Sequence, residues 1–342
     1  MKTIFSEKHL LRDAKTELYG GELVQPFERP SRAKYIMDRL AKVDLGPIVP
    51  PRDFGMDPIL RIHDAGFVAF LQKAWDLWVA EGFKGEAIPT TWPTRRMTDK
   101  IPTGIDGLLG YYALAAETSL TETTWQAAYA SAQVAITGAY DILAGENAVF
   151  SLCRPPGHHA ALDLYGGYCF LNNAAIAAQV LRDNGMERIA ILDVDFHHGN
   201  GTQDIFYTRD DVLFASLHGD PDTAFPNFLG FADETGSGAG EGFNFNYPMP
   251  EGTSFDTWRA ALHQAMNQIV QFKPNALIVS LGVDTFETDP ISFFKLKSPD
   301  FTTYGADIAG LNLPTLFVME GGYDIDEIGL NTVNVLTGFE SA

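Results

Sequence analysis

The sequence predicts an α/β fold with a mostly parallel β-sheet and helices on both faces. Two observations predict this class. Short β-branched and aliphatic runs are apolar on both faces, and helical patterns alternate with these runs along the chain. Strands that are covered by helices on both sides have this character. The length of 342 residues fits one large α/β domain or two smaller domains, so it does not decide the domain count.

Five runs are expected to form strands, and a polar or glycine-rich turn follows each of them. They are residues 148–152, 189–195, 212–217, 276–283 and 314–319. Five other segments carry apolar residues at helical spacing. They are residues 32–41, 66–80, 123–143, 172–182 and 254–272, the last with Ser254 as its N-cap.

Two long segments show little periodicity and contain several prolines. They are residues 1–30 and 81–104. We expect both to be surface loops, and long ordered loops in α/β enzymes often shape the entrance of a site.

The charge is strongly acidic, with 24 Lys and Arg against 44 Asp and Glu and a formal net charge of −20. This balance argues against a nucleic-acid partner, because phosphate binders carry basic patches. It would attract cations, or it would only keep the surface soluble. The chain has no apolar run of about 18 residues and no secretory signal. With only Cys153 and Cys169, a reduced cytoplasmic protein without a membrane partner is expected.

Polar groups follow four of the five candidate strands. In a parallel sheet, ligands gather at the carboxyl ends of the strands. The groups at these ends are His158 and His159 after the first strand, Asp193, Asp195 and His197 at the second, Asp284 after the fourth and Tyr323 after the fifth.

Asp195 and His197 lie two positions apart on an extended segment, so their side chains point the same way. With Asp284 they offer two carboxylates and one imidazole and leave a coordination position open, which suits a catalytic metal such as zinc. The alternative is that these groups only cap a strand and form turns. The side chains of the adjacent His158 and His159 are expected to diverge, so proton transfer suits them better than joint metal binding.

Four motifs are long and specific. They are Arg-Pro-Pro-Gly-His-His at 154–159, Gly-Tyr-Cys-Phe-Leu-Asn-Asn at 167–173, Asp-Val-Asp-Phe-His-His-Gly-Asn-Gly-Thr-Gln at 193–203 and Glu-Gly-Gly-Tyr at 320–323. In this order they resemble the arginase/deacetylase superfamily, and specifically its zinc-dependent deacetylase branch. Within that branch, the chain is more similar to the bacterial acetylpolyamine amidohydrolases than to the histone deacetylases.

The resemblance implies a single deacetylase domain over residues 1–342 with the arginase/deacetylase fold. Its central, mostly parallel sheet would have eight strands. The loops 1–30 and 81–104 would shape the active-site entrance, and the protein would be a homodimer.

The resemblance also implies a role for each group at the strand ends. Asp195, His197 and Asp284 would bind one Zn²⁺ per subunit, which would act as a Lewis acid and lower the pKa of a water molecule. His159 would be the general base and then the general acid, and His158 would tune the charge beside it.

Tyr323 would donate its hydroxyl to the developing oxyanion. Asp193 would orient His158, and Asn200 would orient His159. Class I histone deacetylases have Asp at the position of Asn200. The amide can still orient the ring, but it favours the imidazolium less than a carboxylate would.

Two structural K⁺ sites are implied by the same resemblance, largely through main-chain oxygens. The first would use Asp193, Asp195, His197, Ser216 and Leu217, and the second would use Phe206, Arg209, Val212 and Phe243. The alternative for both is a set of turns with ordered water.

Substrate selection would depend on aromatic and acidic residues. Tyr168 and Phe225, with Gly167, match the walls of a narrow tunnel that accepts methylenes and attracts an ammonium. Asp106 and Glu117, expected in the helix after the 81–104 segment, would pair with a distal ammonium at the rim. The alternative for these acids is a solvated helix face. Acetylputrescine, acetylcadaverine and acetylspermidine-like amines are the expected substrates.

Two other functions stay open from the sequence. One is a deacetylase of protein lysine or of other small acylated amines. The other is a non-catalytic binding protein of the same fold, which would be expected to lack part of the metal or proton-transfer set. A binuclear manganese ureohydrolase would need more Asp ligands than this chain offers, and it would give Tyr323 no role.

Overall fold

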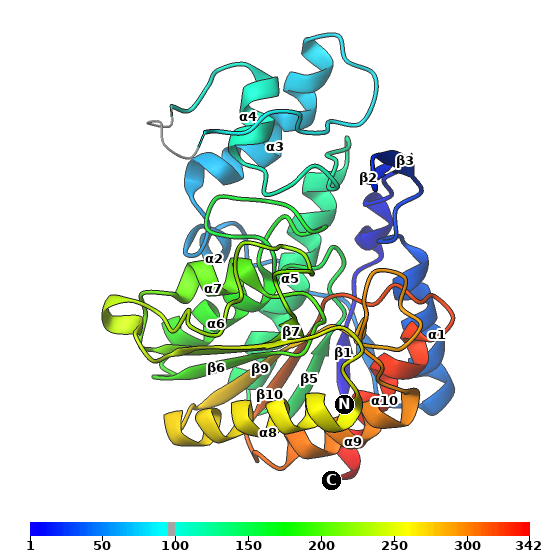
Figure 1. The fold of residues 1–342 in the computed structure, drawn as a ribbon, viewed down its shortest axis with the longest axis vertical. Coiled ribbons are helices and arrows are strands. Elements are labelled where there is room, and N and C mark those ends of the chain that lie inside the picture. Colours follow the sequence, from blue (N-terminus) through cyan, green and yellow to red (C-terminus); the bar gives the residue numbers. More distant parts are fainter. Residues whose placement is uncertain (95–99) are drawn as a thin grey trace.

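The computed structural model describes residues 1–94 and 100–342, and these residues form an α/β fold around one eight-stranded sheet (Figure 1). All seven strand pairs in this sheet are parallel. The strand order is β4-β1-β5-β10-β9-β6-β7-β8. Their bounds are β1 Lys2–Ile4, β4 Ile48–Val49, β5 Ala148–Ser151, β6 Ile189–Asp193, β7 Val212–Gly219, β8 Asn244–Met249, β9 Ala276–Leu281 and β10 Thr315–Met319. The predicted fold class is confirmed.

Ten α-helices lie in the described residues. They are α1 Ser31–Val43, α2 Asp57–Leu60, α3 Ala65–Ala80, α4 Ile105–Tyr111, α5 Thr124–Leu143, α6 Asn173–Asp183, α7 Asn200–Phe206, α8 Phe255–Phe272, α9 Ser298–Ala309 and α10 Ile328–Ser341. Among the described helices, none is long and apolar enough to cross a membrane.

The core lies in two layers, one on each face of the sheet. Alternate residues of one strand enter different layers, because successive side chains point to opposite faces. On β6, Ile189 and Ile191 belong to the layer that also contains residues of α5 and α6, whereas Ala190 and Leu192 belong to the layer that contains residues of α1, α8, α9 and α10. Both layers are apolar, so the strands read as continuous apolar runs in the sequence.

Residues 1–30 contain more secondary structure than expected, and the interpretation of this segment as a surface loop is wrong. Its strand β1 lies inside the sheet, between β4 and β5. A 3₁₀ helix, Glu7–Leu11, follows, and then a two-stranded hairpin of β2 Glu17–Tyr19 and β3 Glu22–Val24. Strands of two or three residues show no periodicity of their own, so hydrogen bonds to neighbouring strands determine where they form.

The structure adds detail to two smaller expectations, the N-cap of α8 and the loop over 81–104. Ser254 stands at the N-cap of α8, but its side chain makes no capping hydrogen bond. In the described part of the 81–104 segment, only an isolated bridge of Ala87 to Leu120 interrupts the loop. The remaining residues, 95–99, lie outside the described residues.

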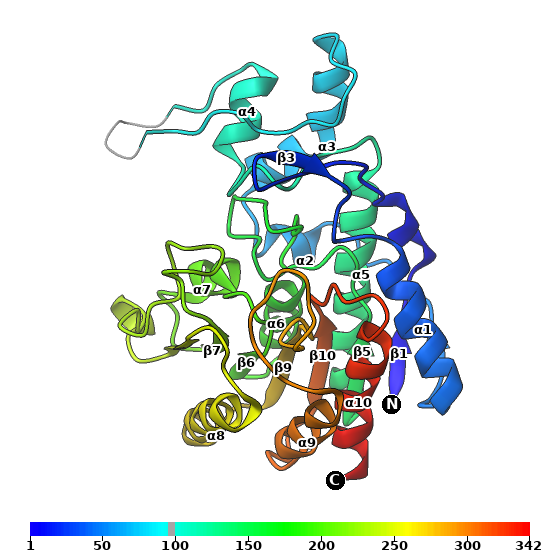
Figure 2. The same cartoon turned by 45° about the vertical axis from the view of Figure 1, so that its right-hand side comes forward.

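The carboxyl ends of the strands point toward one side of the molecule. Figure 2 shows α3, α4 and the hairpin strand β3 beyond this side, whereas α8 and α9 lie toward the opposite end. The segments that follow β5, β6, β9 and β10 therefore meet under a cover made of chain from the first third of the sequence.

Candidate active site

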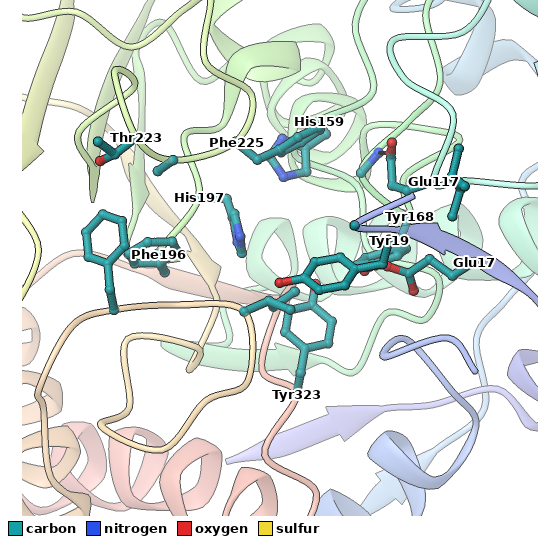
Figure 3. A pocket seen from close by; sticks show the side chains of 16 residues that line it. Glu17, Tyr19, Glu117, His159, Tyr168, Phe196, His197, Thr223, Phe225 and Tyr323 are labelled. Carbon is teal, nitrogen blue, oxygen red and sulfur yellow. Dashed lines mark hydrogen bonds between the residues drawn. The ribbon is translucent and has the colours of Figure 1, made fainter. Parts of the chain in front are cut away.

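A pocket of about 400 Å³ opens at the carboxyl ends of the strands (Figure 3). His159 and His197 lie deep in it, and Tyr323 faces them from the segment after β10. Aromatic side chains line its walls, and acidic residues join them near the hairpin. The predicted residues among its lining are Glu117, His159, Gly167, Tyr168, His197, Phe225 and Tyr323.

Asp195, His197 and Asp284 form a compact, buried group. Their candidate ligand atoms all lie within 4.8 Å of one another. His197 Nδ1 is 3.0 Å from Asp284 Oδ2 and 3.3 Å from Asp195 Oδ1. Backbone amides hold both carboxylates: the Gly321 amide donates to Asp195 at 2.7 Å, and the Phe196 amide donates to Asp284 at 2.8 Å. The structure thus brings together the three predicted ligands from two strand ends.

The electrostatics of this group suit a bound cation. Burial alone would raise the pKa of Asp195, but the facing His158 and His197 lower it well below its usual range. Burial and the neighbouring Asp195 raise the pKa of Asp284 to about 6. Burial would lower the pKa of His197, yet its hydrogen bonds to the two carboxylates raise it to about 10. Two buried carboxylates this close repel each other unless positive charge lies beside them, and a metal ion that His197 ligates would replace the proton of this ring.

His158 and His159 lie side by side, with ring centroids 4.0 Å apart, so the expectation that their side chains diverge is wrong. Each ring is held by a different acceptor. His158 Nδ1 is 2.9 Å from Asp193 Oδ2, and His159 Nδ1 is 2.6 Å from Asn200 Oδ1. Both rings are buried, but only His159 lines the pocket.

The two histidines differ in proton affinity. Burial lowers the pKa of His159 well below its ordinary value, and the neighbouring His158 and His197 lower it further. Burial would also lower the pKa of His158, but Asp195 and Asp193 raise it to about 10. A neutral ring beside a charged ring is the arrangement expected when one acts as a base.

Tyr323 follows two glycines, and the site leaves no room for a side chain at the first of them, Gly321. A Cβ on Gly321 would lie 2.5 Å from carboxylate oxygens of Asp195 and Asp284. The Tyr323 amide donates to Asp289 Oδ2 at 2.8 Å, and the Arg32 guanidinium lies over the Tyr323 ring, 4.9 Å from its centroid. Burial raises the pKa of Tyr323 well above its ordinary value, so the phenol keeps its proton.

Tyr168 and Phe225 form two walls of the pocket. The Phe225 ring stands perpendicular to the His159 ring, with centroids 5.0 Å apart. The Tyr168 ring lies 5.6 Å from that of Tyr323. Gly167 lies directly against His159, since a Cβ at this position would be 2.2 Å from His159 Cδ2. Both predicted walls therefore contact groups with expected chemical roles.

The sequence prediction missed the hairpin side of the pocket. Glu17, Leu18, Tyr19 and Gly20 all line it. The Tyr168 hydroxyl donates a hydrogen bond to Glu17 Oε1 at 2.7 Å, and Glu17 is buried. A signal was present, because Gly-Gly between two short β-prone runs is typical of a tight hairpin turn.

The two predicted rim acids take different places. Glu117 lines the pocket, but it lies after the end of α4 and not in this helix. Its Oε1 accepts a hydrogen bond from the Gly167 amide at 2.7 Å. Asp106 lies in the first turn of α4, is exposed and is not among the residues that line this pocket.

The segments with the predicted K⁺ ligands are neighbours in space. Asp193 on β6 pairs in register with Ser216 on β7. For the second set, Phe206 ends α7 and Val212 begins β7. The carbonyl of Phe243 accepts from the Phe214 amide at 2.9 Å. Leu217 lies on β7, and Arg209 lies in the turn that leads to it.

Known proteins are similar to this chain over nearly its whole length. The model of the histone deacetylase domain family matches residues 26–339. The chain is 59% identical to the acetylpolyamine amidohydrolase of Mycoplana ramosa, over 99% of each chain. It is 54% identical to acetylpolyamine amidohydrolase 1 of Pseudomonas aeruginosa, over 100% of this chain and 99% of the relative.

A solved structure is also closely similar. The crystal structure of acetylpolyamine aminohydrolase from Burkholderia pseudomallei superposes with a TM-score of 0.95 at 38% identity, over 100% of this chain and 99% of that chain.

Proposed function

The chain belongs to the histone deacetylase domain family, and from this premise we propose that it hydrolyses the acetyl amide of acetylated polyamines, releasing acetate and the free amine. The observation that carries the proposal is the arrangement of His159, Tyr323 and the Asp195 group around one pocket. The relatives that match over nearly the whole chain are named acetylpolyamine amidohydrolases.

The residues present fit a divalent metal. Asp195, His197 and Asp284 would hold it, because two carboxylates and one imidazole are a ligand set of catalytic zinc. We propose zinc, one ion per subunit. When bound, the ion supplies Lewis acidity toward the acetyl carbonyl and toward a water molecule.

His159 takes the proton of the attacking water in this proposal. Its low pKa keeps it neutral, and Asn200 fixes the ring through Nδ1, so Nε2 is available to accept. As the C–N bond breaks, His159 returns the proton to the leaving nitrogen, which departs as the free amine. His158 stays beside it as a charged neighbour that Asp193 orients.

Tyr323 donates its hydroxyl to the carbonyl oxygen as negative charge develops there. The phenol suits this role, because it is protonated at neutral pH and faces His159 and His197 across the pocket (Figure 3). A donor that is already in place stabilises this charge without reorganisation, and such interactions are often the largest single contribution to catalysis.

The pocket composition favours a long cationic amine. Tyr168, Phe225 and Tyr19 offer aromatic faces to methylenes and to an ammonium. Glu117 and Glu17 add carboxyl groups on the same lining. A distal ammonium of an acetylated diamine can pair with such a carboxylate, and this pairing would set the register of the acetyl group.

Further properties belong to the same proposal. The two sets of predicted K⁺ ligands lie on neighbouring segments, and K⁺ ions bound there would stabilise the turns around β6 and β7. The 81–104 segment and residues 1–30 would shape the entrance of a single domain. A homodimer in the cytoplasm is proposed, and the two unpaired, buried cysteines agree with a reducing compartment.

The direct test uses zinc-loaded protein and N-acetylputrescine. The proposal predicts that acetate and putrescine form in equal amounts, and that a chelator-treated sample regains activity when zinc is returned. Formation of neither product by the zinc-loaded protein would contradict the proposed activity.

A further inference from the structure

Glu320 links the two loops that carry the acid–base and oxyanion groups. It directly follows β10, and its side chain is fully buried. Its Oε2 accepts hydrogen bonds from the Gly157 amide at 2.6 Å and from the His158 amide at 3.1 Å. We propose that Glu320 is a positioning residue, which fixes the backbone of the His158–His159 loop relative to Tyr323. This inference rests on the proposed function.

The His158–His159 loop depends on such contacts because residues 152–160 contain no helix or strand. Side chains and amides from other elements hold its backbone. Ser131 Oγ donates to the carbonyl of Pro155 at 2.7 Å, and the Gly201 amide donates to the carbonyl of His158 at 3.0 Å. Glu320 is the contact that comes from the strand end of Tyr323.

The backbone of Glu320 is itself firmly placed. Its amide donates to the carbonyl of Leu281 at 3.0 Å, and its carbonyl accepts from Arg32 Nη2 at 2.5 Å. The next residue, Gly321, donates to Asp195. The segment 320–323 therefore contacts the His158–His159 loop through Glu320 and the predicted metal ligand Asp195 through Gly321. It also carries the predicted oxyanion donor, Tyr323.

In this proposal the length of the Glu320 side chain places its oxygen at the two amides, and its charge is not needed for this role. Both amides donate to the same oxygen, Oε2, whereas Oε1 has no hydrogen-bond partner among the described residues. A glutamine can present one oxygen to both amides and place its NH₂ group at the other position. An aspartate keeps the carboxylate but is shorter by one methylene, about 1.5 Å.

The test compares Glu320→Gln with Glu320→Asp in the zinc-loaded enzyme. If side-chain length holds the loop, Glu320→Gln keeps kcat within about threefold of wild type. Glu320→Asp then lowers kcat by about ten- to a hundredfold, since a displacement of about 1 Å at a reacting group has effects of this size. KM is expected to change little, because Glu320 does not line the pocket.

Hydrogen exchange over residues 154–160 gives a readout besides activity. Exchange is expected to be faster in the Asp variant and unchanged in the Gln variant, with equal zinc content. The proposal is overturned if Asp is active and Gln is not, which would assign the effect to charge. It is also overturned if both variants keep kcat, or if both lose it equally.

Failure of this inference is distinguishable from failure of the proposed function. The wild-type enzyme is assayed beside the variants on acetylputrescine and on an acetyl-lysine peptide. The variant-to-wild-type ratio is taken on whichever substrate wild type hydrolyses. Wild-type inactivity on acetylputrescine would contradict only the substrate proposal, and the exchange measurement would still test the position of the loop.

Discussion

The phenol of Tyr168 donates a hydrogen bond to the buried carboxyl group of Glu17 at 2.7 Å, and these residues lie 151 positions apart in the chain. This contact joins the β2–β3 hairpin to the pocket wall beside Tyr323. The Phe27 amide also donates to Glu17, at 3.1 Å. The N-terminal segment is therefore a structural part of the pocket.

Loss of this contact should weaken both the fold and the pocket. In Tyr168→Phe, the buried Glu17 loses one of its two donors, the one to Oε1, and we expect the free energy of unfolding to fall by about 1–3 kcal/mol. KM for acetylputrescine should rise more than kcat falls. Tyr304→Phe is the matched control, because the buried Tyr304 hydroxyl has no hydrogen-bond partner among the described residues. Equal destabilisation of the two variants in urea unfolding would contradict this account.

Tyr323→Phe tests the oxyanion role. The ring would keep its contacts with Arg32 and Tyr168, so fold and zinc content should be unchanged. Loss of one oxyanion donor costs about 10²–10³ in kcat. Steady-state kinetics with metal analysis measure this. A variant with nearly normal kcat would remove Tyr323 from the chemistry.

Gly167→Ala tests the close approach of the backbone to His159. The added Cβ would lie 2.2 Å from His159 Cδ2 at a φ of +55°, so the ring must move. We expect kcat to fall by about a hundredfold. Gly185→Ala serves as the control, because Gly185 also has positive φ, at +96°, but nothing lies within 4 Å of the added atom. The prediction fails if both variants have the kinetics of wild type.

The pH dependence of stability should show the buried Glu320. Burial raises its pKa to about 7 in the folded state, against 4.5 for an ordinary glutamate. Between these values the native protein holds a proton that the unfolded chain releases, so this contribution is present below pH 4.5 and is lost as the pH rises through 7. Tm measured over this range should fall less steeply for Glu320→Gln than for wild type. Equal slopes of Tm against pH for wild type and Glu320→Gln would contradict the raised pKa of Glu320.

Much of the fold was predictable because buried strands of four to eight residues carry a recognisable apolar pattern. The runs that became β5, β6, β7, β9 and β10 are apolar on both faces, and the sheet that they form is parallel as predicted. Strands β1 and β4 have only three and two residues, and they exist because neighbouring strands supply their hydrogen-bond partners. The local sequence of two or three residues cannot predict such a strand.

Some residues of the candidate site were also predictable from the sequence, and others were not. Asp195, His197 and Asp284 were identifiable because each follows a recognisable strand, and the structure brings them together. Glu17 was missed because its partner, Tyr168, is far away in sequence. Asp106 was expected at the rim, but it lies on an exposed turn of α4 outside the pocket lining. Contacts that form only in the tertiary structure decide both cases.

The substrate preference tests the central claim most directly. Zinc-loaded enzyme is assayed for kcat/KM on acetylputrescine, acetylcadaverine, acetylspermidine and an acetyl-lysine peptide, at low and high salt. An acidic, aromatic pocket predicts higher kcat/KM for the acetylated amines, with an advantage that shrinks as salt screens the charges. Equal kcat/KM across the panel, or a preference for the peptide, would contradict the account.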